Sequence, residues 1–341
     1  MTAMPQARRR SALPAIAVTG VGAIIGQGIV KSLRADPRDT RVIGIDLSDQ
    51  SPAPRWVDAF EKKPAGVSED DPAYLDFWTR IVRAHGIALI LPGLEIDVAF
   101  LDAHRAHFAD LGVRLALNTP ELIAQTTDKW DFGGLLADIG YTGIPSLLPP
   151  ECWAQALEQL GPAPLLMKPR RGNGSRGIVT LHDETDYAYW RAKTRAPCLL
   201  QRIVGTADSE YTVGVFGLGD GRYLGPLIFQ RRLSAAGNTL MARVVPAHPV
   251  LEAAVATLCR HFPPLGPTNL QFRLEGGHAY LLEINPRFSS SNSLRTAFGF
   301  NEAAMAVDFY LEGTLPQAPV LREGIAWRYT EDFIHHAGTD L

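Results

Sequence analysis

A strand–turn–strand segment near the C-terminal end places the strongest constraint on the fold of this 341-residue chain. The apolar content predicts strands over Thr268–Leu274 and Ala279–Ile284, joined by a short glycine turn. Side chains two apart on a strand share a face, so Glu283 and Asn285 point the same way, and the partner strand can bring Gln271 beside them. Three oxygen-bearing side chains then converge. Such ligands suit magnesium, which takes its remaining ligands from phosphates and water.

Positive charge accompanies this segment and a second one earlier in the chain. Arg287 follows Asn285 by two residues and can meet phosphate or carboxylate oxygens. Lys168 ends an apolar strand and precedes a basic, glycine-rich loop over residues 169–177. Glycines let backbone N–H groups approach phosphates, and lysine or arginine neutralises them. The loop lacks the GxxxxGK(S/T) order of a Walker motif, so a solvated basic turn is the alternative reading.

The N-terminal third alternates short apolar strands with helices. Such alternation predicts a parallel sheet covered on both faces, extending to about residue 118. From Thr119 the pattern changes to mixed α and β elements, which indicates a second domain. The elements expected in the first domain are strands Ala15–Thr19, Arg41–Asp46, Ile87–Pro92 and Val113–Leu117, and helices Gly28–Arg34 and Tyr74–Ala84.

The first glycine turn supports a rival interpretation. Gly20, Gly22 and Gly26 lie between a strand and a helix, and Asp46 ends the next strand, as in a dinucleotide-binding fingerprint. An NAD(P)-dependent oxidoreductase is therefore an alternative. The GxGxxxG spacing departs from the strict GxGxxG form, and no hydride-transfer constellation follows.

Composition excludes several other classes. A net charge of −3 and a pI of about 6.3 give no basic field for nucleic acid. Three separated cysteines form no CxxC pair, which argues against a disulfide framework or a zinc site. No uninterrupted apolar stretch is long enough to span a membrane. We expect a cytoplasmic protein.

Several motifs occur together in a fixed order. They are Asp128-Lys129, Lys168 with its glycine loop, Gln201 to Ile203, Glu210-Tyr211, Asn269-x-Gln271 and Glu283-x-Asn285-x-Arg287. With these motifs the chain resembles the ATP-grasp superfamily over nearly its whole length. The runs 268–272 and 283–291 are most similar to one synthetase half of the carbamoyl-phosphate synthase large subunit. The chain carries a single such half, has lysines at 129 and 168 where arginines are common in that half, and has no glutaminase-like region. Stand-alone chains of this shape more often resemble carboxylate–amine ligases.

The resemblance implies a nucleotide site for ATP with Mg²⁺, or Mn²⁺ in its place. Lysines would contact the phosphates, residues 171–177 would form a mobile lid loop, and Glu210 would hold the ribose. The implied ATP-binding residues are Lys129, Lys168, Arg171, Gly172, Asn173, Gly174, Ser175, Gln201, Arg202, Ile203 and Glu210. The implied metal ligands are Gln271, Glu283 and Asn285, and the catalytic residues are Arg287, Lys168 and Arg231.

The substrate site has weaker candidates. Arginine forks suit carboxylates, although a helix-surface position is the alternative for Arg295. Acidic residues after a parallel strand could meet a substrate amine, and solvated acids are the alternative for them. The candidates are Glu95 with Asp97 close by, Arg232 beside Arg231, Ser290, Ser291 and Arg295.

Together these observations predict an α/β chain in three parts. A Rossmann-like parallel-sheet domain covers residues 1–118, an ATP-grasp α+β core covers 119–315 with a mobile lid subdomain at about 142–203, and an extension covers 316–341. The expected activity is ATP-dependent joining of a small carboxylic acid, such as an amino acid, to an amine through an acyl phosphate. Alternatives are activation of bicarbonate or carbamate, the oxidoreductase, and a binding module without turnover. The expected partners are a small acid and an amine, with no nucleic acid or membrane; subunit number stays open, a homodimer being one option.

Overall fold

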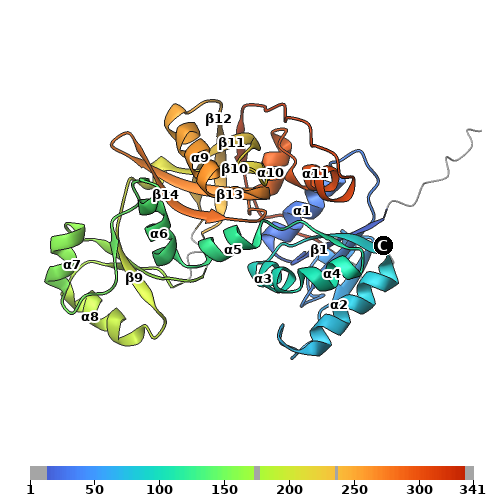
Figure 1. Ribbon diagram of the computed structural model, residues 1–341, viewed down its shortest axis with the longest axis horizontal. Coiled ribbons are helices and arrows are strands. Elements are labelled where there is room, and N and C mark those ends of the chain that lie inside the picture. Colours follow the sequence, from blue (N-terminus) through green and yellow to red (C-terminus); the bar gives the residue numbers. More distant parts are fainter. Residues whose placement is uncertain (1–13, 173–176, 235–236, 335–341) are drawn as a thin grey trace, which may run out of the picture. The chain divides into compact units, whose positions relative to one another are not determined.

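The computed structural model describes residues 14–172, 177–234 and 237–334, which form two compact units (Figure 1). Of these residues, unit 1 holds 14–116, 303–316 and 333–334, and unit 2 holds the rest. The expected boundary at 118 lies close to the observed division. The C-terminal division differs from the expected one, because 303–316 joins unit 1 whereas 317–332 returns to unit 2.

Unit 1 contains the predicted parallel sheet. Its strand order is β3-β2-β1-β4-β5, and every pairing in it is parallel. The strands are β1 (Ala15–Thr19), β2 (Val42–Asp46), β3 (Ala59–Lys62), β4 (Ile87–Leu91) and β5 (Arg114–Leu115). The helical elements are α1 (Ile24–Arg34), η1 (Ala53–Arg55), α2 (Pro72–His85), α3 (Glu95–Ala103), α4 (Arg105–Asp110), most of α11 (Glu302–Ala306) and η3 (Val307–Leu311).

The first glycine turn is shorter than expected, because α1 begins at Ile24 rather than Gly28. A Cβ at Gly26 would lie 2.2 Å from the carbonyl oxygen of Gly20, so only glycine fits there. Asp46 closes the turn, since its Oδ2 accepts from the Gly22 N–H at 2.8 Å and its Oδ1 accepts from the Leu47 N–H at 2.7 Å. A dinucleotide site would need this carboxylate for a ribose hydroxyl, whereas here it is bonded to the turn itself.

A small antiparallel sheet in unit 2 lies within the predicted range 142–203. Its order is β6-β9-β7-β8, and two helices pack their apolar residues against it. The strands are β6 (Ser146–Leu147), β7 (Leu165–Pro169), β8 (Val179–Leu181) and β9 (Cys198–Arg202), and the helices are α7 (Trp153–Leu160) and α8 (Glu184–Lys193).

A larger antiparallel sheet in unit 2 has the order β14-β13-β10-β11-β12-β15. The last strand comes from the expected C-terminal extension, which therefore forms part of this sheet. The strands are β10 (Glu210–Leu218), β11 (Tyr223–Leu233), β12 (Thr239–Val245), β13 (Leu265–Glu275), β14 (His278–Asn285) and β15 (Ile325–Trp327). The helices of this part are α5 (Pro120–Thr127), α6 (Lys129–Asp138), α9 (Pro249–His261) and α10 (Asn292–Ala297), besides the short turn η2 (Ala207–Ser209).

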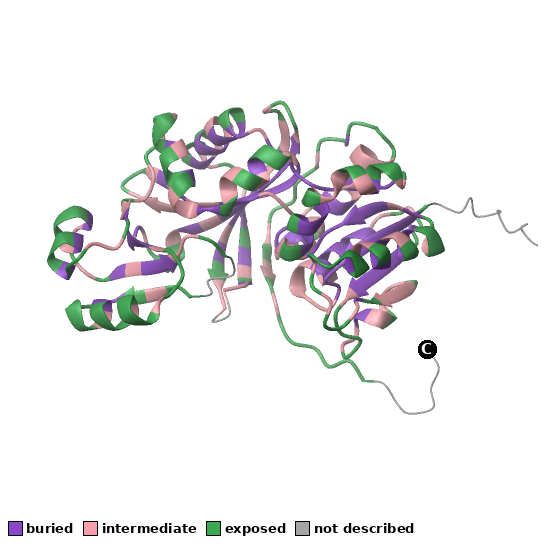
Figure 2. Cartoon of the chain, turned by 60° about the horizontal axis from the view of Figure 1, so that its bottom comes forward, coloured by how far each residue is buried: buried purple, intermediate pink, exposed green. Residues whose placement is uncertain are grey.

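The two faces of the large sheet differ in chemistry. On one face, Val213, Ile228 and Phe272 pack with apolar residues of α5, α6 and α9 in a continuous core. Figure 2 shows this burial concentrated in the strands, with exposed residues on the outer sides of the helices. Because side chains alternate along a strand, the residues between these point to the opposite face. That opposite face carries the predicted polar residues.

A bulge in β14 separates its apolar and polar residues. Gln271 pairs with Glu283, whereas the next residue, Phe272, pairs with Leu281, so Leu282 is an extra residue. Such a bulge reverses which face the following side chains meet. Without the bulge, Leu281 and Glu283 would share a face because they are two residues apart. With it, Leu281 joins the core, whereas Glu283 is not part of the core.

In the described ranges, no helix combines the length and the apolar character needed to cross a bilayer.

Candidate active site

Two adjacent strands bring the predicted metal ligands together. Gln271 on β13 lies directly opposite Glu283 on β14, and Asn269 lies opposite Asn285. The pairing predicted from strand periodicity is therefore confirmed. Asn285 Nδ2 donates to Glu283 Oε1 at 2.9 Å, and so the two side chains share one edge of the sheet.

The donor set fits a magnesium ion that is shared with a nucleotide. Glu283 supplies a carboxylate and Asn285 an amide oxygen, and both are hard ligands. Arg287 Nη2 donates to Asn285 Oδ1 at 3.0 Å, which places a guanidinium next to the same group. In the described part of the chain no three His, Cys, Asp or Glu residues cluster as a metal site, so any ion here would depend on amides and on ligands from outside the protein.

Lys168 lies at the end of β7 in a buried position, with its side chain directed at β9. Its Nζ donates to Gln201 Oε1 at 2.7 Å, and Gln201 Nε2 donates to Ser146 Oγ at 2.8 Å. Burial, and to a smaller extent the charge of Lys129, lower the pKa of Lys168 to about 8, while Glu283 opposes the shift. The amine thus lies within electrostatic range of both the second lysine and the metal-ligand carboxylate.

Asp128 fixes the start of α6 and, with it, the second lysine. Its Oδ1 accepts from the Trp130 N–H at 3.0 Å, which is an N-cap, and from Arg170 Nε at 2.9 Å. Lys129 Nζ donates to the Gly172 carbonyl at 2.6 Å. Residue 129 is thereby tied to the beginning of the glycine loop. The predicted ATP contacts Asn173, Gly174 and Ser175 lie outside the described residues.

A cavity of about 600 Å³ in unit 2 joins these groups. Lys129 and residues of α6 line one side, Lys168 and Gln201 of the small sheet line another, and Glu283 lies on the large-sheet side. Ile144 and Leu282 add apolar surface. A cavity of this size, lined by two lysines and by the carboxylates of Asp131, Asp138 and Glu283, is suited to a polar small molecule.

Beyond the cavity lining, Glu210 and Arg231 form a buried network. Arg231 Nε and Nη2 donate to Glu210 Oε1 at 3.2 and 2.9 Å, and Nη2 also donates to Gln271 Oε1 at 2.5 Å. Arg273 donates to Glu210 Oε2 from Nε at 3.1 Å and from Nη2 at 2.9 Å. Burial lowers the pKa of the Arg231 guanidinium, and Glu210 opposes that shift. Gln271, predicted as a metal ligand, therefore accepts from a cation in this structure.

Several weaker candidates for the substrate site have other surroundings within their own units. Arg232 neighbours Arg231 on β11 but is largely exposed and pairs with Asp208 at 3.0 Å. Asp97 is buried in unit 1 and pairs with Lys63, so it is not a solvated acid, and its contact with a substrate amine stays a prediction. Glu95 is half-buried in the first turn of α3 of the same unit.

The two serines after the metal motif are involved in protein contacts. Ser291 Oγ lies 3.0 Å from Thr239 Oγ1, and both residues are buried. The Ser290 carbonyl accepts from Arg328, which follows β15. The C-terminal segment thus holds this loop in place.

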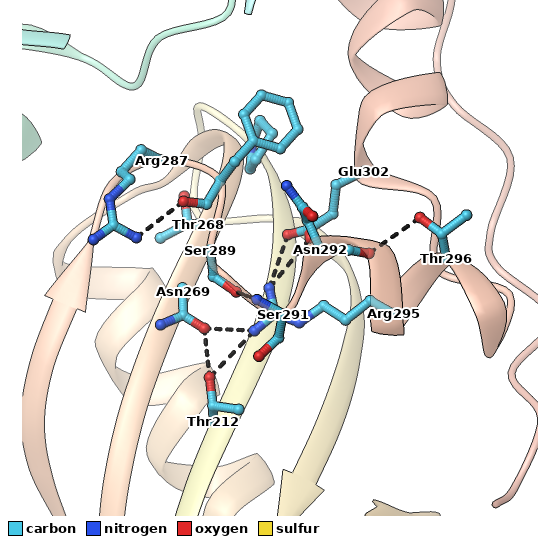
Figure 3. Close-up of polar contacts among 12 residues, drawn as sticks. Thr212, Thr268, Asn269, Arg287, Ser289, Ser291, Asn292, Arg295, Thr296 and Glu302 are labelled. Atoms are coloured by element: carbon cyan, nitrogen blue, oxygen red, sulfur yellow. Dashed lines mark hydrogen bonds and ion pairs between the residues drawn. The ribbon is translucent and has the colours of Figure 1, made fainter. Parts of the chain in front are cut away.

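Arg295 is completely buried, which rules out the helix-surface alternative. Its Nη1 donates to Glu302 Oε1 at 3.0 Å, and its Nη2 donates to Asn269 Oδ1 at 2.5 Å (Figure 3). A Cβ at Gly214 would come within 2.6 Å of the Arg295 Cζ, so glycine makes room for the guanidinium. Arg295 thus supports Asn269, the cross-strand neighbour of Asn285, and its guanidinium is enclosed by protein groups.

Some of these residues were not singled out from the sequence. Arg273 lies two residues beyond Gln271 on the same strand, so its shared face could have been recognised. Ser146 and Thr212 could not be recognised from the sequence, because their partners, Gln201 of β9 and Arg295 of α10, lie far away in sequence.

The parallel sheet of unit 1, with the small and large antiparallel sheets of unit 2 around a lysine-lined cavity, has the parts of an ATP-grasp protein. Comparison with known proteins agrees. Residues 199–333 match a family model described as ATP-grasp in the biosynthetic pathway with Ter operon. The carbamoyl phosphate synthase large chain of Streptomyces griseus subsp. griseus is 26% identical over 277 residues, covering 72% of this chain and 25% of that protein. The chain thus spans about a quarter of the length of this relative.

Solved structures show the same fold. N5-carboxyaminoimidazole synthetase from Staphylococcus aureus, complexed with ADP, matches with a TM-score of 0.70 and 17% identity over 91% of this chain and 81% of that one. L-amino acid ligase from Bacillus licheniformis matches with a TM-score of 0.63 and 14% identity over 91% of this chain and 75% of that one. Residues 199–333 thus match an ATP-grasp family model, and the fold of the chain is similar to that of these solved structures.

Proposed function

We propose that this chain is an ATP-dependent ligase that joins a small carboxylic acid to an amine and releases ADP and phosphate. The observation that carries the proposal is the grouping of Lys129, Lys168 and Glu283 on one cavity, with Asn285 and Arg287 at its sheet edge. Phosphoryl transfer requires mostly positioning and charge neutralisation, and these groups offer both.

In the proposed reaction, a carboxylate oxygen of the acid attacks the γ-phosphorus of ATP, and the bond to the ADP oxygen breaks. Lys129 and Lys168 neutralise phosphate charge, and Gln201 borders the adenine end of the cavity. The amine nitrogen then attacks the acyl carbon, phosphate leaves, and the nitrogen loses a proton, giving an amide. Arg231 and Arg287 bind the oxyanions that develop.

Mg²⁺ would supply charge neutralisation between the nucleotide phosphates. Glu283 and Asn285 are the residues that would hold it, because they present a carboxylate and an amide oxygen on the same edge. Manganese could take the same ligands.

A second candidate within the same fold is activation of bicarbonate or carbamate. The resemblance of residues 268–272 and 283–291 to the carbamoyl-phosphate synthase half, and the match to that large chain, favour it. The proposal of an amine ligase has its own support in the overall match to an L-amino acid ligase structure.

ADP release from Mg²⁺-ATP tests both candidates. The protein is assayed with a panel of amino acids and small acids, with and without amines, and products are identified by mass. We expect ADP only when an acid and an amine are both present. ADP formed with bicarbonate alone would favour the second candidate, and no ADP with any acid, together with NADPH binding, would support the oxidoreductase.

A further inference from the structure

The Glu210 carboxylate is saturated by protein donors. Its two oxygens receive four N–H groups, two from Arg231 and two from Arg273, at 2.9 to 3.2 Å. A carboxylate offers about four lone-pair sites, so none remains for the ribose hydroxyl that the family resemblance assigns to this residue. Glu210 is also only 4% exposed.

The guanidinium of Arg231 is fixed along one edge and open at the other. Nε and Nη2 are bonded to Glu210 and Gln271, so three N–H groups have protein acceptors. Nη1 donates to no group among the residues that the structure describes. Two N–H donors of a buried arginine thus remain for a ligand.

The local charge favours an anion at this position. Glu210 contributes one negative charge between Arg231 and Arg273, which leaves these three residues with one positive charge in excess, although the Glu283 carboxylate also acts on Arg231. Gln271 adds no charge, although it lies directly opposite Glu283. With a carboxylate at position 271, Arg231 would have two acidic partners and the excess would vanish.

We propose that Glu210 is a positioning residue that, together with Gln271, directs Nη1 of Arg231 toward an oxyanion of the reacting groups, either a carboxylate or a phosphate. This rests on the proposed function. It removes Glu210 from the ribose site and gives Gln271 a hydrogen-bonding role beside the metal site. Glu283 and Asn285 then remain as the metal-holding pair.

Binding measurements can test this inference without turnover. The full chain is titrated with MgADP, and the MgADP-saturated protein is then titrated with inorganic phosphate and, separately, with acetate. For Glu210→Gln we expect an ADP Kd within about twofold of wild type and a Kd for the bound oxyanion at least about tenfold weaker, since the charged bonds that orient Arg231 are lost. Arg231→Met should show the same loss, and Asp308→Asn, which removes a carboxylate from an arginine pair in unit 1, should show none.

A second variant provides an independent test in case Glu210→Gln does not fold. Gln271→Glu leaves Glu210 intact but adds a carboxylate beside Arg231, and it should also weaken phosphate or acetate binding while sparing ADP. Whichever of the two anions binds the wild type identifies the oxyanion class. A large loss of ADP affinity in Glu210→Gln, or unchanged anion affinity in both variants, would overturn the inference. If the wild type binds ADP but neither anion, the anion site is wrong; if it binds no ADP, the proposed function itself fails.

Discussion

Lys168 Nζ donates to Gln201 Oε1 at 2.7 Å, so a buried lysine has a neutral amide, rather than a carboxylate, as its hydrogen-bonding partner. The amine is also close enough to Lys129 for the second positive charge to oppose its own. Burial contributes most to lowering the pKa of Lys168 to about 8, the charge of Lys129 adds to that shift, and Glu283 opposes it. The lysine expected to contact ATP phosphates is therefore poised to lose its proton near pH 8.

This arrangement predicts that nucleotide affinity falls as the pH rises above 8. The free protein holds Lys168 charged below about 8 and neutral above it, whereas bound phosphates restore the charged form. ADP binding should then take up a proton above pH 8, and the Kd should rise by up to about tenfold per pH unit there. Calorimetry in buffers of different ionisation enthalpy measures both quantities. Lys168→Arg, which stays charged, should lack this pH dependence; the same profile in both proteins would contradict the assignment.

A carboxylate in place of the amide should shift this pH dependence. Gln201→Glu puts a negative charge on the atom that accepts from Lys168, which raises the lysine pKa by about one unit or more. The pH at which ADP affinity starts to fall should rise accordingly, as measured by the same titrations. Gln50→Glu, on the surface of unit 1, adds the same charge and should leave the profile where it is. An unshifted profile in Gln201→Glu would mean that another group titrates.

Local sequence pattern predicted the parts of the fold that depend on apolar runs. Strands β1, β2 and β4 are nearly as expected because each is an unbroken buried run. Strand β3 was missed because its four residues are half-buried or exposed and show no apolar pattern. Strand β15 was missed because its pairing with β12 joins segments far apart in sequence, which no local pattern reveals.

The same reasoning applies to the site. Strand periodicity placed Gln271 beside Glu283, since both lie on one hairpin. Strand periodicity could not predict the hydrogen bond from Arg231 to Gln271, because β10 lies between their strands. This contact depends on the order of three strands in the sheet. The burial of Arg295 in α10 likewise depends on Gly214, which lies far away in sequence on β10.

Glu283 is the only carboxylate of the predicted metal-ligand set, so its removal should strongly reduce metal binding and turnover. Glu283→Gln keeps the size of the side chain but weakens a divalent-ion site, and turnover should fall by about a hundredfold or more. Electron paramagnetic resonance of free Mn²⁺ in the presence of ADP should show a parallel loss of bound metal. Glu312→Gln in unit 1 is the matched control. Near-normal activity or metal binding in Glu283→Gln would contradict the metal assignment.

The buried pair of Arg295 and Glu302 predicts a large and non-additive effect on stability. Both side chains are fully buried, so Glu302→Leu leaves a guanidinium without its countercharge and should lower the free energy of unfolding by about 3–5 kcal/mol. Arg295→Met combined with Glu302→Leu removes both charges and should recover much of that loss. Urea unfolding of the two variants measures the difference, with Lys62→Met, in an exposed pair, expected to stay close to wild type. If the double variant is no more stable than Glu302→Leu, the guanidinium is not the source of the penalty, and the support that Arg295 gives to Asn269 becomes the better explanation.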